Sequence, residues 1–214
     1  MSPAAALLID FGGVLTADIS AGHRAWCRRS GFPEAALDEV LAQWRADPPE
    51  AGNPVLRVES GELAAAGFEL LLAGALHART GKAVRPDGLA AAILASFPRN
   101  DALCRFTAGV IASGTPAVVV TNSWGSGRPW EAIGTFRGAV ISHETGVRKP
   151  DPKIFRIAVD MAGVSAHRCV FLDDLPSNVE SARAAGIDGI HHVHTADTVR
   201  QLRARFPNVT YDPA

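Results

Sequence analysis

The stretch LLIDFGGVLT, residues 7–16, decides the fold of this chain. Its first three residues continue an apolar run that begins at Ala4, and the run ends in the single carboxylate of Asp10. Two glycines, Gly12 and Gly13, then allow the chain to turn sharply. This pattern is typical of a buried strand that presents an aspartate at its carboxyl end, as a nucleophile or a metal ligand.

The composition indicates a folded protein and excludes several classes of partner. Of the 214 residues 47% are hydrophobic, which is enough for a substantial core. The net charge of −1 gives no electrostatic basis for binding nucleic acid or an anionic membrane. The N-terminal apolar run is too short to cross a bilayer, and no basic leader precedes it. The three cysteines are widely spaced and form no CxxC pair, so we expect reduced thiols and a cytoplasmic protein. The sequence leaves open whether the protein is a monomer or a homodimer.

Short apolar runs predict a parallel sheet. They are apolar on both faces, which favours a sheet covered by helices on both sides, as in Rossmann-like α/β folds. The stretches Lys153–Ala162 and Asn178–Ala185 have helical patterns and separate the last three runs. The predicted strands are Ala5–Ile9, Ala117–Val120, Ala139–Ile141, Cys169–Leu172 and Gly189–Val193.

A helical insertion separates the first two predicted strands. Residues 19–97 contain no convincing strand, and helical patterns occur at Ala35–Trp44, Gly61–His77 and Asp87–Phe97. We therefore expect an α/β core domain formed by residues 1–18 and 98–214, and an inserted helical cap domain formed by residues 19–97.

Polar residues follow four of the predicted strands at their carboxyl ends. They are Asp10; Thr121, Asn122 and Ser123; Arg148 and Lys149; and Asp173 and Asp174. In an open parallel sheet these ends meet at one edge, where ligands bind. Three aspartates crowded at neighbouring strand ends repel one another unless a cation neutralises them, which independently predicts a divalent cation such as Mg²⁺.

These motifs resemble the haloacid dehalogenase superfamily of aspartate-nucleophile hydrolases over essentially the whole chain. The resemblance rests on DFGGVL at Asp10, TNS at Thr121, RKPDPKIF at Lys149, and FLDD at Asp173 and Asp174, in that order. The stretches TNSW and VFLDDLPSN look most similar to the phosphatase domain at the N-terminus of soluble epoxide hydrolases and to its bacterial relatives. The position of the helical insertion is also similar to that of the cap in this group.

The resemblance implies a nucleophile and a metal site. In the family the first aspartate, here Asp10, attacks phosphorus, and water then cleaves the aspartyl-phosphate. Mg²⁺ is expected on the side chains of Asp10 and Asp174 and on the backbone carbonyl of Gly12, with Asp173 beside them.

The resemblance also implies how a phosphorylated small molecule is held. Lys149 is expected to offset the charge of the nucleophile and of the phosphoryl group. Thr121 and the backbone of Asn122 and Ser123 are expected to bind the phosphoryl oxygens. Trp124 follows this loop directly and is the tryptophan best placed to line a substrate pocket.

Gly12 departs from the family pattern. A second aspartate usually stands there and transfers protons to the leaving oxygen and from water, which contributes about 10²–10⁴-fold to the rate. Some relatives, including a bacterial sugar-phosphate phosphatase, also carry glycine there. Three outcomes remain open: hydrolysis of substrates whose leaving group needs little protonation, replacement of the acid by Asp18 or by the more distant His23 or His143, or phosphate-ligand binding with little or no turnover.

A metal-independent 2-haloacid dehalogenase-type activity is a further alternative. Such enzymes of the superfamily also lack the second aspartate, since a halide leaves without a proton. They typically carry an aromatic residue in its place and no paired aspartates in the fourth motif, so Asp173 and Asp174 speak against this chemistry. The sequence therefore favours a Mg²⁺-dependent phosphatase-type hydrolase acting on a small phosphomonoester.

Overall fold

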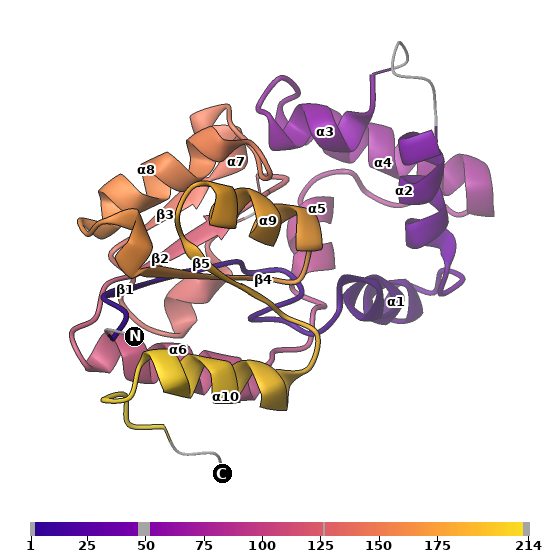
Figure 1. Cartoon of the computed structure of the whole chain (residues 1–214). Helices are drawn as coiled ribbons and strands as arrows, with labels where there is room; N and C mark the ends of the chain where they lie inside the picture. Colours follow the sequence, from indigo (N-terminus) through magenta and orange to yellow (C-terminus); the bar gives the residue numbers. More distant parts are fainter. Residues whose placement is uncertain (1–2, 47–51, 126, 212–214) are drawn as a thin grey trace.

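A computed structural model describes residues 3–46, 52–125 and 127–211 of the chain. Its centre is a sheet of five parallel strands in the order β3-β2-β1-β4-β5 (Figure 1). β1 lies in the middle, between β2 and β4. The strands are β1 (Ala6–Ile9), β2 (Ala117–Thr121), β3 (Gly138–Ile141), β4 (Cys169–Asp173) and β5 (Asp188–His191). This confirms the predicted Rossmann-like α/β fold.

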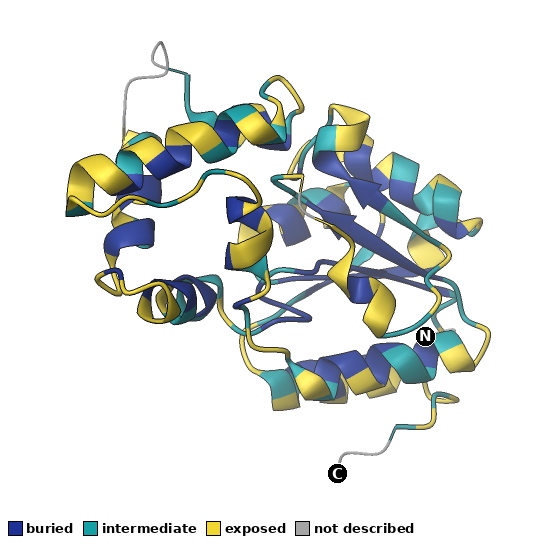
Figure 2. Cartoon of the chain, turned by 180° about the vertical axis from the view of Figure 1, so that it is seen from behind, coloured by how far each residue is buried: buried dark blue, intermediate teal, exposed yellow. Residues whose placement is uncertain are grey.

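Helices cover both faces of the sheet because its strands are apolar on both faces. In β1, Leu7 and Ile9 pack in one hydrophobic cluster with residues of α6 (Asp101–Ala112) and α10 (Thr195–Arg205). Ala6 and Leu8 point the other way, into a cluster with residues of α8 (Pro152–Ala162) and α9 (Pro176–Ala184). The short helix α7 (Ser142–Thr145) follows β3, and the 3-10 turns η2 (Pro129–Ala132) and η3 (Ala166–Arg168) complete the connections. The sheet is buried between these layers (Figure 2).

The segment between β1 and α6 forms a second, helical body beside the sheet (Figure 1). It consists of α1 (Ile19–Arg29), α2 (Ala36–Ala46), α3 (Pro54–Glu59), α4 (Ala65–Thr80) and α5 (Leu89–Leu94). These helices surround a hydrophobic cluster of their own, with Trp26, Leu37 and Phe68 among its buried residues. We refer to this body, residues 19–97, as the cap.

The two chain segments that join the cap to the sheet lie side by side. Thr16 and Arg99 form an antiparallel bridge. The N–H of Ala17 donates to the carbonyl of Pro98 at 2.7 Å, and the N–H of Asn100 donates to the carbonyl of Leu15 at 3.0 Å. The chain therefore leaves and re-enters the core at one place.

The strands and helices agree with the sequence patterns except at some boundaries. The predicted strand Gly189–Val193 ends at His191 instead. The predicted helix Gly61–His77 begins only at Ala65, because Gly61 adopts a left-handed φ of 77° and turns the chain after α3. The predicted helix Asp87–Phe97 is shortened to α5, which Gly88 precedes with a left-handed φ of 75°. Within the described residues, no helix has the length and hydrophobicity needed to cross a membrane.

Candidate active site

A buried lysine joins two aspartates at the carboxyl edge of the sheet. Lys149 follows β3, and its Nζ lies 2.8 Å from Oδ1 of Asp10, which follows β1, and 2.6 Å from Oδ2 of Asp173, at the end of β4. Its side chain is only 2% exposed. Burial alone lowers the pKa of Lys149, but the two carboxylates outweigh it and raise the pKa above the usual value. Lys149 therefore stays charged and fixes the position of Asp10.

Asp173 is a buried anchor of this arrangement. Besides pairing with Lys149, it accepts hydrogen bonds at Oδ1 from the backbone N–H of Leu175 and from Asn178 Nδ2, both at 2.9 Å. Both of its oxygens are thus engaged within the chain. Asp173 orients Lys149 and the start of α9, so it is the least available of the three aspartates for another ligand.

Asp10 and Asp174 have the character of cation ligands. Oδ1 of Asp10 is buried, and apart from the ion pair with Lys149 it has no aligned hydrogen-bond partner in the described part of the chain. Burial raises the pKa of Asp10, which Lys149 opposes and Asp173 reinforces. Burial and then Asp173 raise the pKa of Asp174 to about 6. Ligand oxygens of Asp10, Asp173 and Asp174 all lie within 4.8 Å of one another.

The turn after β1 brings its backbone close to Asp174. A Cβ added to Gly13 would overlap the Asp174 carboxylate, and Gly13 has a left-handed φ of 75°. Oxygen donors crowded in this way fit a hard divalent cation such as Mg²⁺. Asp10 and Asp174, with Asp173 beside them, could hold it, and the backbone carbonyl of Gly12 stays a ligand that the resemblance predicts.

The loop after β2 holds the Lys149 peptide. Asn122 accepts from the N–H of Lys149 at 2.9 Å and donates from Nδ2 to the carbonyl of Lys149 at 3.1 Å. The N–H of Ser123 donates to Oγ of the buried Ser142 at 3.1 Å, so this predicted phosphoryl donor already has a partner. Thr121 is buried, and among the described residues its hydroxyl makes one long hydrogen bond, of 3.3 Å, to the carbonyl of Asn122.

A cavity of about 470 Å³ lies above these residues, between the sheet and the cap. The core side of its lining includes Asp10, Gly12, Thr121, Asn122, Ser123, Lys149 and Asp174. The cap side is largely apolar, with Ile19, Leu41, Val55, Ile93 and Phe97 among its residues. Trp124 also lines the cavity and packs on Phe68 with ring centroids 5.0 Å apart. The structure therefore brings all of the predicted site residues except Asp173 to the wall of one cavity, and Asp173 lies directly behind Lys149.

The three suggested substitutes for the missing acid lie in different surroundings. Asp18 lines the cavity, but it is exposed and its Oδ1 accepts from the N–H of Ala21 at 2.9 Å, as the N-cap of α1. His23 is buried and lines the cavity. His143 is not among the residues that line it, and its Nδ1 is buried with no hydrogen-bond partner among the residues that the structure describes.

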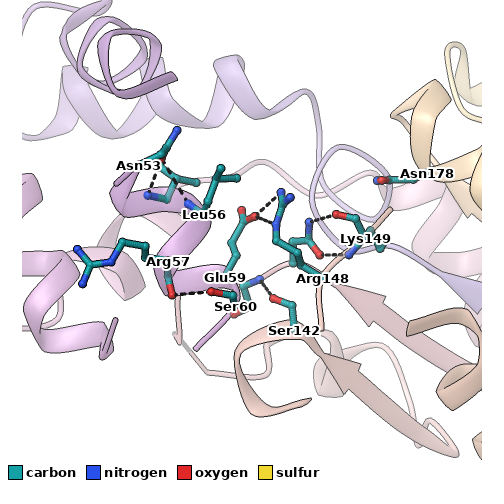
Figure 3. A network of polar contacts seen from close by, with 12 residues as sticks. Asn53, Leu56, Arg57, Glu59, Ser60, Ser142, Arg148, Lys149 and Asn178 are labelled. Carbon is teal, nitrogen blue, oxygen red and sulfur yellow. Dashed lines mark hydrogen bonds and ion pairs between the residues drawn. The ribbon is translucent and has the colours of Figure 1, made fainter. Parts of the chain in front are cut away.

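An ion pair between cap and core closes one side of the cavity. Arg148 donates from Nε to Oε2 of Glu59 at 2.9 Å, and its second nitrogen lies 2.8 Å from the same oxygen (Figure 3). Glu59 ends α3 of the cap, whereas Arg148 directly precedes Lys149. Sequence reasoning gave no role to Glu59, Ser142 or Asn178. Glu59 and Ser142 are ordinary polar residues outside the four motifs, and Asn178 ends the stretch VFLDDLPSN without a chemical feature that singles it out.

The sequence matches a known family and several known proteins. Residues 4–186 match the family described as haloacid dehalogenase-like hydrolase. Over 209 residues the chain is 26% identical to mouse acyl-CoA dehydrogenase family member 10, an alignment that covers 93% of this chain and 19% of that protein. Over 81 residues it is 31% identical to phosphoglycolate phosphatase of Pseudomonas putida, covering 37% of this chain and 30% of that protein.

A third relative is mouse bifunctional epoxide hydrolase 2, 29% identical over 98 residues, which covers 42% of this chain and 18% of that protein. The alignments thus span less than a third of the length of each of these three relatives.

Solved structures share the fold. A family enzyme of Bacteroides thetaiotaomicron, in complex with magnesium and inorganic phosphate, superposes with a TM-score of 0.62 at 21% identity, covering 89% of this chain and 94% of that one. An L-2-haloacid dehalogenase from Xanthobacter autotrophicus superposes with a TM-score of 0.60 at 18% identity, covering 94% of this chain and 83% of that one. Because a magnesium- and phosphate-bound enzyme and a dehalogenase have the same fold, the fold alone does not decide between their chemistries.

Proposed function

Because the chain belongs to the haloacid dehalogenase-like hydrolases, we propose that it is a Mg²⁺-dependent phosphatase that hydrolyses a small phosphomonoester through an aspartyl-phosphate on Asp10. The observation that carries the proposal is the buried Lys149, paired with Asp10 and Asp173 at the floor of the cavity. This arrangement presents one oriented carboxylate to a ligand and keeps a positive charge beside it.

Each core residue has a defined task in the proposed reaction. Asp10 attacks phosphorus, and Lys149 stabilises the charge on the nucleophile and on the phosphoryl oxygens. The hydroxyl of Thr121 would exchange its long hydrogen bond to the carbonyl of Asn122 for one to a phosphoryl oxygen. Asn122 contributes by holding the Lys149 peptide, in addition to any contact from its own backbone. Mg²⁺ bound by Asp10, Asp174 and the Gly12 backbone would neutralise negative charge on the phosphoryl group.

The acidic residues favour phosphoryl transfer over dehalogenation. Asp174 lines the cavity together with Asp10, and its pKa is raised because it is half-buried beside Asp173. Two carboxylates facing one cavity repel a haloacid carboxylate but suit a cation-bound phosphate. The relative named phosphoglycolate phosphatase supports the same choice. The apolar cap side of the cavity suits an organic group with an apolar part.

Phosphate release tests the proposal. Wild-type protein is assayed with 4-nitrophenyl phosphate, with Mg²⁺ and with chelator, next to Asp10→Asn and the matched control Asp160→Asn, which changes an exposed aspartate on α8. We expect release that requires Mg²⁺, that Asp10→Asn abolishes and that Asp160→Asn leaves unchanged. Halide release from a 2-haloacid without metal, or Mg²⁺-dependent phosphate binding without release, would overturn the proposal in favour of the dehalogenase or the binder.

A further inference from the structure

We propose that His23 of the cap, oriented by Asp38, transfers the protons that an aspartate at position 12 would transfer. The inference rests on the proposed phosphatase function and adds the acid and base that this function lacks. It follows from the position of His23 at the cavity, from the contacts that fix its ring, and from the side chain that occupies the space beside Gly12.

The first helix of the cap faces the nucleophile loop with Ile19 and His23. These residues are four apart on α1, so they lie on one face of the helix, one turn from each other. A Cβ built on Gly12 would stand 2.8 Å from Ile19 Cδ1, which places this face directly against the loop of Asp10. Both residues line the cavity. A proton donor one turn beyond Ile19 is therefore near the edge of the phosphoryl site.

The His23 ring is held in one orientation. Its Nδ1 lies 2.5 Å from Oδ1 of Asp38 on α2. An ionised carboxylate can only accept, so the hydrogen is on Nδ1 and the exchangeable position is Nε2. The ring packs against Phe97, edge to face at 5.6 Å, and stacks on Trp124 at 6.3 Å.

Nε2 is the ring nitrogen of His23 that Asp38 does not contact. Among the described residues Nε2 makes no hydrogen bond, and because His23 lines the cavity we take Nε2 to face it. If His23 served only to connect α1 to α2, the contact of Nδ1 with Asp38 would be sufficient, and an unpaired Nε2 at the cavity would have no purpose. In other enzymes a carboxylate orients a histidine in the same way, and the histidine transfers a proton to or from the reacting atom.

The charges around His23 let it hold either protonation state. Burial lowers its pKa, and Arg45 of α2 lowers it further, while Asp38 and, more weakly, Asp18 raise it. The carboxylate of Asp38 stabilises the imidazolium that proton uptake produces. A pKa below the usual value leaves the neutral imidazole abundant near neutral pH, as a base needs, with the acid form increasing at lower pH.

The proposed proton transfers balance over the two half-reactions. In the first, the bond from Asp10 to phosphorus forms, the bond from phosphorus to the leaving oxygen breaks, and Nε2 of the protonated His23 gives that oxygen its proton. In the second, neutral His23 takes a proton from water, the water oxygen bonds to phosphorus, and the bond to Asp10 breaks. The neutral alcohol leaves after the first half-reaction and phosphate after the second, and His23 is protonated again.

Substrates with different leaving groups separate this role from a structural one. Wild type, His23→Gln and Asp38→Asn are compared with 4-nitrophenyl phosphate, whose phenolate leaves without a proton, and with a simple alkyl phosphate. In His23→Gln we expect alkyl phosphate turnover to fall by about 10²-fold or more. The first-turnover burst of nitrophenol should stay within about threefold of wild type, since only the later attack by water needs the base. In Asp38→Asn the fall of alkyl phosphate kcat/KM with rising pH should move to lower pH.

The control and the contrary results are equally specific. Glu39 is next to Asp38 in the sequence, and its carboxylate pairs with Arg79 at 2.6 Å. Glu39→Gln should therefore leave the turnover of both substrates unchanged. Equal losses of the nitrophenol burst and of alkyl turnover in His23→Gln would overturn the inference while the phosphatase function stands. A selective alkyl loss in Asp18→Asn, with His23→Gln like wild type, would assign the role to Asp18 instead. A wild-type protein that hydrolyses neither ester would overturn both the proposed function and this inference.

Discussion

Ile19 occupies the space that a side chain at position 12 would need. A Cβ built on Gly12 would stand 2.8 Å from Ile19 Cδ1, closer than unbonded carbon atoms approach, whereas the backbone of Gly12 is not in the left-handed region. A side chain at position 12 is therefore limited by Ile19 rather than by the φ angle, and Cδ1, the end of the flexible Ile19 side chain, would have to shift. The two residues form a matched pair, one on each side of the boundary between nucleophile loop and cap.

This pairing predicts that an aspartate at position 12 requires Ile19 to shift. Gly12→Asp should destabilise the protein by about 1 kcal/mol, at the low end of overpacking costs, because the end of the Ile19 side chain can move. The double variant Gly12→Asp/Ile19→Ala should recover much of that loss and turn over alkyl phosphates faster than Gly12→Asp alone. Thermal unfolding and phosphate release measure the two effects. A stable, active Gly12→Asp single variant would show that Ile19 moves away freely.

The crowded carboxylates predict a specific response to metal. At neutral pH, Mg²⁺ at 100 times its Kd should raise the free energy of unfolding of the wild type by about 2.7 kcal/mol. The unfolding temperature should rise accordingly. Asp174→Asn should lose most of this increase, because it removes a ligand oxygen beside Asp10. Calorimetry with and without chelator measures the shift.

Asp160→Asn, an exposed aspartate on α8, is the matched control and should keep the whole increase. Equal Mg²⁺ responses in the two variants would place the bound ion elsewhere on the protein.

The core of the fold could be predicted because the sequence patterns that specify it lie within short segments. Each strand is a short run of buried apolar residues. The site residues lie at or just after the carboxyl ends of strands, except Lys149, which follows β3 only after the short helix α7. Asp10 and Asp173 are adjacent because β1 and β4 pair in the sheet, which parallel topology alone implies. The same reasoning placed Lys149 at this edge.

The cap could be predicted only in outline. Its boundaries depend on glycines such as Gly61 and Gly88, whose left-handed φ angles divide the helical patterns. The pairs His23–Asp38 and Glu59–Arg148 join residues 15 and 89 positions apart. No spacing rule connects residues across such separations, since the way the helices pack decides which side chains meet.

The ion pair between Glu59 and Arg148 predicts a coupling between the cap and the site. Its side chains are 12% and 33% exposed, so the interaction is partly shielded from water. Glu59→Gln or Arg148→Met should each destabilise the protein by roughly 1–2 kcal/mol, between the values for exposed and buried pairs. The double variant should lose less stability than the sum of the losses in the two single variants.

Because the pair joins α3 to the loop of Lys149, both single variants should raise KM more than they lower kcat. The exposed pair of Arg28 and Glu34 in the cap provides the control, and Glu34→Gln should change neither parameter. Additive losses in the double variant would mean that the two residues act independently.

His23 predicts how stability depends on pH. Burial lowers its pKa in the folded protein below the ordinary value of 6.5 that the unfolded chain retains, so below that value the unfolded state binds more protons. Its contribution to stability is therefore present above about pH 6.5 and is lost as the pH falls through the folded-state pKa. His23→Gln cannot titrate, so the free energy of unfolding of the variant should decline less between about pH 7 and 5 than that of the wild type.

The exposed His77 on α4 is the matched control, and His77→Gln should follow the wild-type curve. If the wild type and His23→Gln declined in parallel over this range, His23 would have the same pKa in the folded and unfolded chain, and its burial beside Asp38 would have no effect on its charge.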